Sequence, residues 1–296
     1  MAEYLQTEQV RKEQCGKKKG ARYKVLLIET PYWLPGTDLE RILKAYVSGR
    51  IEEGDIVVFS EKALAIAKGN IIDESKIKPG LSAKFLAYFW MRLVWGYLLG
   101  PLCRMRRVSI DNFRKYPAEG SAHKQLALSF SGPLQALRHG SEGGIDVSNL
   151  PFSYACLPLN NAFETAQLLH LSLARLTRSV TTMIVDTDKT YSFLGFHFTP
   201  RPRPMKGIAS LGIAAYIFGR LLKLRKRATP LAIIGCSMGI EEALDIAELA
   251  DRARGFGAGR TAWEMAKRYG VGMTEVTWEM LASSHHFPIV IIRKKT

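Results

Sequence analysis

The chain has 296 residues, of which 47% are hydrophobic and 23% charged. These proportions exclude wholesale disorder, collagen and a coiled-coil fibre, and the length allows one large domain or two medium ones. The 42 Lys and Arg residues outnumber the 27 Asp and Glu residues and give a formal net charge of +15. Such an excess favours acidic partners, namely nucleotides, polyanionic metabolites, nucleic acid or anionic lipid, without choosing among them.

Four cysteines stand at positions 15, 103, 156 and 236, with neither a CxxC motif nor a Cys/His zinc spacing. So few cysteines in a chain of this length fit a reducing compartment. Residues 1–20 also lack the apolar stretch of a signal peptide. We therefore expect a cytoplasmic protein.

Residues 1–22 mix Glu with many Lys and Arg residues and predict a basic flexible arm, followed by a folded domain over 23–296. In the first half of that domain, the pattern predicts a strand at 23–29, a helix at 38–47 capped by Thr37, and strands at 56–59 and 70–72. In the second half it predicts a helix at 161–178, strands at 181–185 and 231–234, a helix at 240–254, two short helices and a strand at 287–292. Strands and helices alternate without a regular strand–helix–strand rhythm, which indicates a mixed α/β or α+β fold.

The most apolar segment of the sequence is Phe85–Cys103, which carries a single charge, Arg92. It is long enough to span a bilayer. However, Arg92 lies near its middle and the pair Gly100-Pro101 would end a helix, whereas a helix that is apolar all round also fits a buried core. We prefer the core helix, keep membrane association as an alternative, and expect a sub-division of the domain near 80–125.

Two acidic loops are the first candidates for chemistry. They are Gly144–Asn149, which contains Asp146, and Val185–Asp188, which contains Asp186. Carboxylates with neighbouring hydroxyl and amide groups are hard oxygen ligands, which suit Mg²⁺ or Mn²⁺ together with substrate phosphates. Taken alone, each carboxylate also fits a structural role, an Asx turn for Asp146 and a strand-end cap for Asp186.

A second candidate is the segment Gly235–Gly239, which matches G-x-S-x-G between a predicted strand and a predicted helix. Ser237 would be the nucleophile of a serine hydrolase. The order of a catalytic triad would be completed by Asp245 or Asp251 and by His285 or His286. Too little chain follows Gly239 for the remaining strands of an α/β-hydrolase, so this function ranks third.

A glycine loop flanked by arginines, Arg254–Arg260, is the third candidate. The backbone N–H groups of such a loop can bind a phosphate. The loop lacks the lysine spacing of a P-loop, and no strand leads into it as in a dinucleotide-binding fold.

Taken together, the segments from about residue 23 to about 292 resemble the coenzyme F-420:L-glutamate ligase family, the γ-glutamyl ligases of deazaflavin coenzyme synthesis. The most specific match is Arg138-His139-Gly140 followed by Gly144–Asn149, which is similar to R-H-G and G-I-D-x-S-N of the family. Further matches are Pro35–Leu39, Glu53–Val58, Ile184–Thr187 and Gly207–Ile213.

The resemblance implies a GTP-dependent ligation, in which the γ-phosphate passes to a substrate carboxylate and the amino group of glutamate attacks the acyl phosphate. By position, Asp146, Asp186 and Thr187 would be ligands of Mg²⁺ or Mn²⁺. Where the family has a Ser/Thr pair and a lysine for the nucleotide, this chain has Glu61-Lys62 and Ile66. The residues expected at the nucleotide are Asn149, Lys62, Lys68, Gly257 and Gly259.

We therefore expect a mixed α+β fold of the ligase family and a cytoplasmic homodimer. Its partners would be a nucleotide and an acidic small molecule, in preference to nucleic acid or a membrane. The alternative from another class is a non-catalytic paralogue that binds metal or nucleotide without turnover.

Overall fold

The computed structural model describes residues 16–17 and 22–295. Most of the predicted basic arm lies outside the described residues. Two described parts of it are in strands, because β1 (Gly16–Lys17) pairs antiparallel with the start of β2 (Arg22–Ile28).

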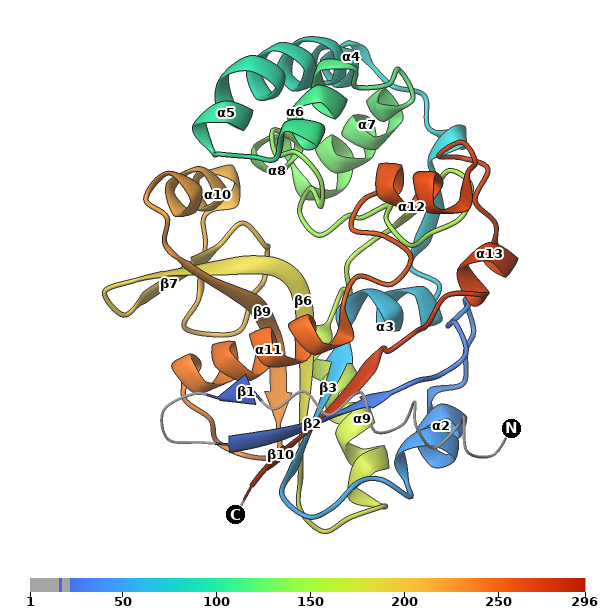
Figure 1. The fold of residues 1–296 in the computed structure, drawn as a ribbon, viewed down its shortest axis with the longest axis vertical. Helices are drawn as coiled ribbons and strands as arrows, with labels where there is room; N and C mark the ends of the chain where they lie inside the picture. The colour runs from blue at the N-terminus through green and yellow to red at the C-terminus, as the bar shows by residue number, and fades with distance from the viewer. Residues whose placement is uncertain (1–15, 18–21, 296) are drawn as a thin grey trace.

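A mixed sheet of eight strands forms the centre of the described chain (Figure 1). Its order is β1-β2-β10-β3-β6-β7-β8, and β9 pairs with β6 outside this path. The remaining strands are β3 (Asp55–Ser60), β6 (Val180–Phe193), β7 (Phe196–Thr199), β8 (Ala209–Ser210), β9 (Arg225–Ile234) and β10 (Ile289–Lys294). The pairs β3–β6 and β7–β8 are parallel and the others antiparallel. A separate two-stranded sheet joins β4 (Ile71–Asp73) to β5 (Tyr154–Cys156).

Helices cover both faces of the central sheet. One face packs against α2 (Leu39–Ile42), η2 (Leu43–Val47), α3 (Glu61–Ala67) and α9 (Ala162–Ala174), and the other against α11 (Ile240–Arg254). Successive residues of β3 alternate between the two cores: Val57 faces the first and Val58 the second. Because both faces are buried, the strand is an uninterrupted apolar run rather than an alternating one.

The segment 81–136 forms a helical lobe at one end of the molecule, at the top of Figure 1. Its helices are α4 (Leu81–Phe85), η4 (Leu86–Leu99), α5 (Gly100–Leu102), α6 (Arg107–Arg114), α7 (Gly120–Ser131) and α8 (Pro133–Ala136), where η4 has π-helical hydrogen bonding. The lobe has apolar clusters of its own, built around Leu86 and Leu126 and around Met91 and Trp95. The remaining helices of the described residues are the 3₁₀ helix η3 (Glu74–Lys76), α10 (Gly212–Leu221), α12 (Ala262–Tyr269) and α13 (Trp278–Ala282).

The mixed α/β class predicted from the sequence is confirmed. Several boundaries differ, however. Asp38, and not Thr37, caps α2 by accepting a hydrogen bond from Arg41 N at 3.1 Å, because the Thr37 hydroxyl is already bonded to the Leu34 backbone. β6 runs well past residue 185, so Asp186 lies inside a strand rather than after one.

The apolar segment 85–103 is not the fully buried core helix that we preferred. Trp95 and Met91 are buried, whereas Phe85 and Leu98 on the same segment are more than half exposed. None of the helices among the described residues is both long and apolar enough to cross a bilayer.

Candidate functional site

The candidate site lies where β3 ends and α3 begins. Ser60 is the last residue of β3 and pairs with Val185 of the parallel strand β6. Glu61, the next residue, therefore lies near Asp186, which follows Val185, and Lys62 comes directly after Glu61 in the first turn of α3. The carboxyl ends of neighbouring parallel strands are a common place for ligand sites in α/β proteins.

Lys62 contacts the first acidic loop. Its ammonium group donates to the Asp146 carboxylate, to Ser148 O at 2.9 Å and to Ser148 Oγ at 2.8 Å. The Ser148 backbone N–H also donates to Asp146 Oδ1 at 2.8 Å. Burial alone would raise the pKa of Asp146, but the Lys62 ammonium outweighs it and holds that pKa below its usual range.

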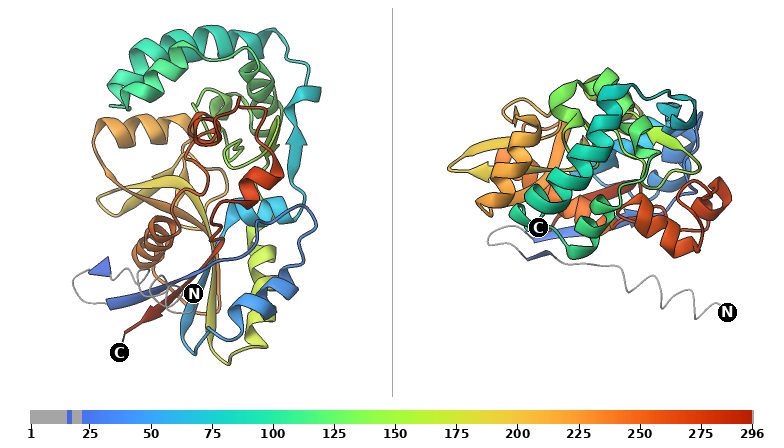
Figure 2. Two further views of the ribbon diagram at one scale, coloured as in Figure 1. Left: turned by 45° about the vertical axis from the view of Figure 1, so that its right-hand side comes forward. Right: turned by 90° about the horizontal axis from the view of Figure 1, so that it is seen from above.

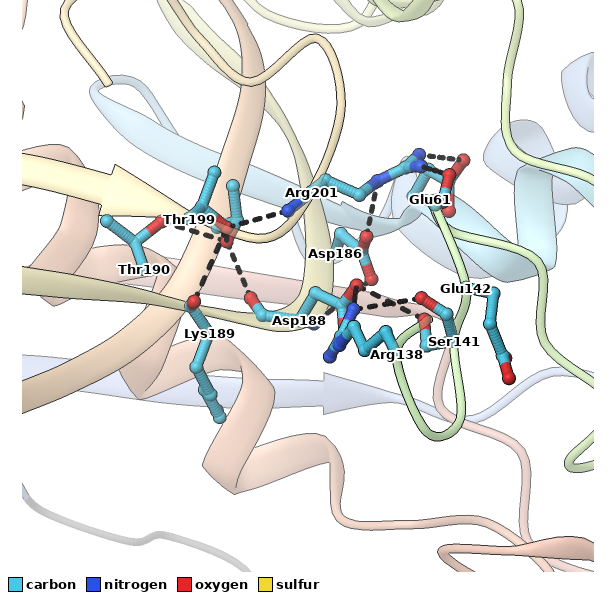
Figure 3. Close-up of polar contacts among 12 residues, drawn as sticks. Glu61, Arg138, Ser141, Glu142, Asp186, Asp188, Lys189, Thr190, Thr199 and Arg201 are labelled. Carbon is cyan, nitrogen blue, oxygen red and sulfur yellow. Dashed lines mark hydrogen bonds and ion pairs between the residues drawn. The ribbon is translucent and has the colours of Figure 1, made fainter. Parts of the chain in front are cut away.

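Arg201 contacts the second acidic group (Figure 3). Its Nε lies 2.6 Å from Asp186 Oδ2, close enough for an ion pair but off the hydrogen-bonding direction, so that both atoms lack a hydrogen bond within the described chain. Its Nη2 donates to Glu61 Oε1 at 3.0 Å, and its Nη1 donates to Gly143 O at 2.8 Å. One buried guanidinium thus holds a carboxylate that follows the end of β3 and a carboxylate within β6.

Asp186 is buried beside two other acidic side chains, Asp188 and Glu61. Burial raises its pKa to about 7; Arg201 opposes that rise, whereas the charges of Asp188 and Glu61 add to it. One partner of Asp186 is the Asp188 backbone N–H, which donates to Asp186 Oδ1 at 3.1 Å. A further cation near Asp186 would therefore be favoured electrostatically.

Gly144 is needed for the approach of Arg201. Its φ of +93° suits glycine, and a Cβ at this position would lie 1.7 Å from Arg201 Nη1. The glycine of the G-I-D-x-S-N block therefore makes room for the guanidinium.

A second buried arginine positions the β6 bulge. Arg138 donates two hydrogen bonds to Asp188, at 2.7 and 2.8 Å, and Ser141 Oγ adds a third at 3.2 Å (Figure 3). The same loop contributes Glu142, which accepts from the buried Lys124 at 2.6 Å and lies 2.8 Å from His123 Nε2. Ion pairs thus connect the helical lobe to the strand that carries Asp186.

The three predicted metal ligands do not form one cluster, because each has a different surrounding. Asp146 is paired with Lys62, Asp186 is paired with Arg201, and Thr187 is exposed on the bulge between Asp186 and Lys189. Residues 16–17 and 22–295 contain no group of three or more His, Cys, Asp or Glu side chains that could hold a metal ion.

The predicted nucleotide contacts Asn149, Gly257 and Gly259 do come together. Asn149 Oδ1 accepts from Ala258 N at 2.6 Å, and its Nδ2 donates to Gly259 O at 3.0 Å. A Cβ on Gly257 would lie 2.8 Å from Asn149 Oδ1, which explains a glycine there. Asn149 therefore joins the G-I-D-x-S-N loop to the glycine loop.

Lys68, another predicted nucleotide contact, lies at the opposite end of α3 from Lys62. It follows the last residue of α3, whereas Lys62 is in the first turn, so about 9 Å of helix separates them. Its ammonium donates to Thr165 Oγ1 of α9 at 2.7 Å.

The structure does not assemble the triad proposed around Ser237. Gly235 follows β9 near the ends of the strands at which β3 and β6 begin, since Ile234 pairs with Thr182. His285 and His286 precede β10 near the opposite ends of the strands, where Ile289 pairs with Phe59 at the end of β3. Asp245 is paired with Arg225 and Arg227, and Asp251 with Lys189. A strand length, on the order of 15 Å, therefore separates nucleophile from base, and this prediction is wrong.

Sequence reasoning missed Arg201, Glu61 as its partner, and the pair Arg138–Asp188. Arg201 stands in a stretch rich in proline and cations, 199–206, which has the composition of a surface loop. Arg138 belongs to the R-H-G match, but the carboxylate that it binds lies 50 positions away. Only the fold brings these charges together.

A family model described as F420-0:Gamma-glutamyl ligase matches residues 27–212. The chain belongs to this family. The matched region contains Lys62, Asp146, Asp186 and Arg201, and it ends before the glycine loop. An uncharacterized protein of Methanocaldococcus jannaschii is 37% identical over 258 residues, which cover 83% of this chain and 87% of that protein.

Membership of the γ-glutamyl ligase family implies a divalent metal ion, and the donor chemistry of the site fits one. Asp146, Asp186 and Thr187 are hard oxygen donors, and the buried Asp186 Oδ2 has no hydrogen bond. Mg²⁺ is usually held by one or two protein carboxylates, with water and substrate phosphates completing its shell. Both carboxylates already have a cation of the chain as partner, so protein side chains alone do not complete the shell of an ion here.

Proposed function

We propose that this protein is a metal- and GTP-dependent carboxylate–amine ligase of the γ-glutamyl ligase type. The observation that carries the proposal is that both acidic loops are joined to the dipeptide Glu61-Lys62. Lys62 binds Asp146, and Glu61 is joined through Arg201 to Asp186. A site of this kind combines carboxylates for a divalent ion with a cation for phosphate oxygens, which suits phosphoryl transfer.

In this proposal Lys62 is the residue that contacts the phosphates. Its side chain is 22% exposed, and Asp146 and Ser148 hold its ammonium in place. A cation oriented in advance stabilises developing negative charge without reorganising during the reaction.

Arg201 is a positioning residue. It is almost fully buried and its hydrogen bonds go to Glu61 and Gly143, so it orients carboxylates rather than substrate.

Asp146, Asp186 and Thr187 would hold Mg²⁺ or Mn²⁺, which supplies charge neutralisation on the phosphates when bound. The substrate carboxylate oxygen bonds to the γ-phosphorus as the bond to GDP breaks. The amine nitrogen then bonds to the acyl carbon as inorganic phosphate leaves. The acceptor is an acidic small molecule, which the net charge of +15 favours.

The experiment incubates the full chain with the deazaflavin F-420-0, L-glutamate, GTP and Mg²⁺ or Mn²⁺. We expect GDP, phosphate and a product heavier than the acceptor by one glutamyl residue, detected by mass spectrometry. Asp186→Asn should abolish the product. Asp111→Asn, an exposed acidic residue of the helical lobe, is the matched control and should leave the product yield unchanged.

A second outcome would favour the non-catalytic paralogue. Asp146 and Asp186 are already paired with Lys62 and Arg201. A protein that binds a nucleotide without catalysing a reaction could have the same ion pairs. GTP with Mg²⁺ would then raise the melting temperature while no product forms with any acidic acceptor. The expected homodimer and the cytoplasmic location belong to the same proposal, and analytical ultracentrifugation tests the dimer.

A further inference from the structure

The outer side of the helical lobe carries an unusual row of apolar side chains. They come from α4, η4 and α5, which lie along the end of the molecule away from the central sheet (Figures 1 and 2). We call this row the outer face. It consists of Phe85, Phe89, Leu93, Tyr97, Leu98 and Leu102, each between 45% and 62% exposed.

The spacing puts these residues on one side of the helix. Positions 85, 89, 93 and 97 recur every four residues, close to the period of a helix with π-type hydrogen bonding. The opposite side of the same helix is already used: Leu86, Met91 and Trp95 are buried in the clusters of the lobe. The folding of the lobe therefore does not account for the outer face, and exposed patches of this kind mark interaction sites.

Charge identifies the partner. Between Glu74 and Asp111 the sequence has seven Lys and Arg residues and no Asp or Glu. Lys84, Arg104 and Arg107 are exposed, and none of them forms an ion pair with a described residue. Aromatic and leucine side chains beside unpaired cations are typical of helices that lie in the headgroup region of an anionic membrane.

Two arginines in this region also stack on aromatic rings of the helix. The Arg92 guanidinium lies 4.6 Å from the centre of the Tyr88 ring, and that of Arg114 lies 4.4 Å from the Tyr97 ring. Both guanidinium groups also bond within the lobe, Arg92 to Tyr116 O at 2.8 Å and Arg114 to Gly96 O at 3.0 Å. They therefore fix these two aromatic rings, and the cations left for headgroups are Lys84, Arg104 and Arg107.

A second copy of the chain fits this surface less well. A symmetric dimer places the same patch on both sides of its interface, so the cations of one face would meet the cations of the other. A span is also ruled out for the described helices. We propose that the outer face binds the surface of a membrane containing anionic lipids, with η4 lying in the interface plane.

The experiment is vesicle flotation with the full chain. One vesicle preparation contains phosphatidylcholine alone and the other phosphatidylcholine mixed with phosphatidylglycerol. We expect the chain to float with the anionic vesicles and to dissociate as salt is raised. Equal flotation with both preparations, or none with the anionic one, overturns the proposal.

Variants locate the contact. Leu93→Gln with Leu98→Gln should weaken anionic binding about tenfold or more, because two exposed apolar side chains no longer enter the lipid. Lys84→Gln with Arg104→Gln and Arg107→Gln should weaken it by about a hundredfold at low salt. The matched control is Leu168→Gln with Leu171→Gln, exposed leucines on α9, which should change nothing.

Circular dichroism of each variant checks that the fold is retained. Analytical ultracentrifugation of the same proteins tests self-association as the competing explanation. If an outer-face variant dissociates a dimer while its flotation stays unchanged, the outer face is a dimer interface and the membrane proposal is overturned. Ligase activity of the outer-face variants in solution should equal that of the wild type, so a failure of the ligase proposal and a failure of this one are distinguishable.

Discussion

Lys62 and Asp146 form an ion pair at the first turn of α3, although 84 positions separate them in the sequence. Their side chains are 22% and 24% exposed, so the pair is reachable from solvent but largely desolvated. The contact ties the G-I-D-x-S-N loop to the end of β3. It also means that a divalent ion at Asp146 must share this carboxylate with the lysine.

Removing the lysine should therefore destabilise the protein and uncover the carboxylate. We expect Lys62→Met to lower the free energy of unfolding by about 1–3 kcal/mol, measured by urea denaturation, because Asp146 loses its cation. Mg²⁺ should restore part of this loss in the variant and leave the wild type nearly unchanged. Lys68→Met, at the other end of the same helix, is the control and should cost less than about 1 kcal/mol. A variant as stable as the wild type would contradict the prediction.

Arg201 should be more costly to remove. Arg201→Met leaves Glu61 and Asp186 buried without their guanidinium, which costs about 3–5 kcal/mol in buried pairs. Adding Asp186→Asn to this variant should recover part of the stability, because one of the two orphaned charges is then absent. Equal stability of the single and the double variant in urea denaturation would show that Arg201 does not act through Asp186.

Asn149 should control the glycine loop. Asn149→Ala removes the hydrogen bonds to Ala258 and Gly259 and keeps a residue with a Cβ at a φ of +52°. We expect a loss of about 2 kcal/mol and faster proteolytic cleavage within residues 255–259. Asn149→Gly loses the same bonds without the backbone strain, so it should be about 1 kcal/mol more stable than Asn149→Ala. The reverse order of the two variants would contradict this account.

His139 should make the protein less stable in mild acid. Burial, with help from Arg138, lowers its pKa to about 3, and its Nε2 has no hydrogen bond within the described chain. The unfolded chain binds a proton near pH 6.5 and the folded chain does not, so stability is lost as pH falls from about 6.5 towards 3. The loss is up to about 1.4 kcal/mol per pH unit.

The variant His139→Phe tests this directly. Its ring should fit among Trp95, Phe113 and Tyr216, whose ring centres lie 4.4–5.1 Å from that of His139. We expect the variant to gain more stability over the wild type at pH 5 than at pH 7 in thermal unfolding. His286, whose pKa burial lowers to about 4, contributes the same dependence in both proteins and cancels from the comparison. A gain independent of pH would show that folding does not lower the pKa of His139.

Local patterns predicted much of the fold. The apolar runs of β3 and β10 and the helical spacing of α9 and α11 identified these elements because each buries a face, and burial fixes periodicity. The same patterns failed at β6, whose polar continuation through Asp186 and Asp188 is held by Arg201 and Arg138. No local pattern signals ion pairs formed over such distances.

In the candidate site too, the sequence predicted individual residues but not their partners. The family-like blocks located Asp146, Asp186 and Asn149, and the structure brings Asn149 to Gly257 and Gly259. The roles of these residues in binding metal or nucleotide stay predictions. Sequence patterns could not show that Lys62 and Arg201 pair with the two carboxylates, because partner choice depends on which strands become neighbours. The parallel pairing of β3 with β6 brings Glu61 towards Asp186, and the bridge from Asp146 to Cys156 of β5 fixes the loop that Lys62 contacts.

The position of β10 has a consequence for synthesis in the cell. This strand comes last along the chain and yet lies between β2 and β3, whose residues are made more than two hundred positions earlier. During synthesis, the backbone N–H and C=O groups of β2 and β3 that pair with β10 stay unpaired until residues 289–294 leave the ribosomal exit tunnel. We expect a chaperone to bind these unpaired strand edges during translation, since exposed strand edges promote aggregation.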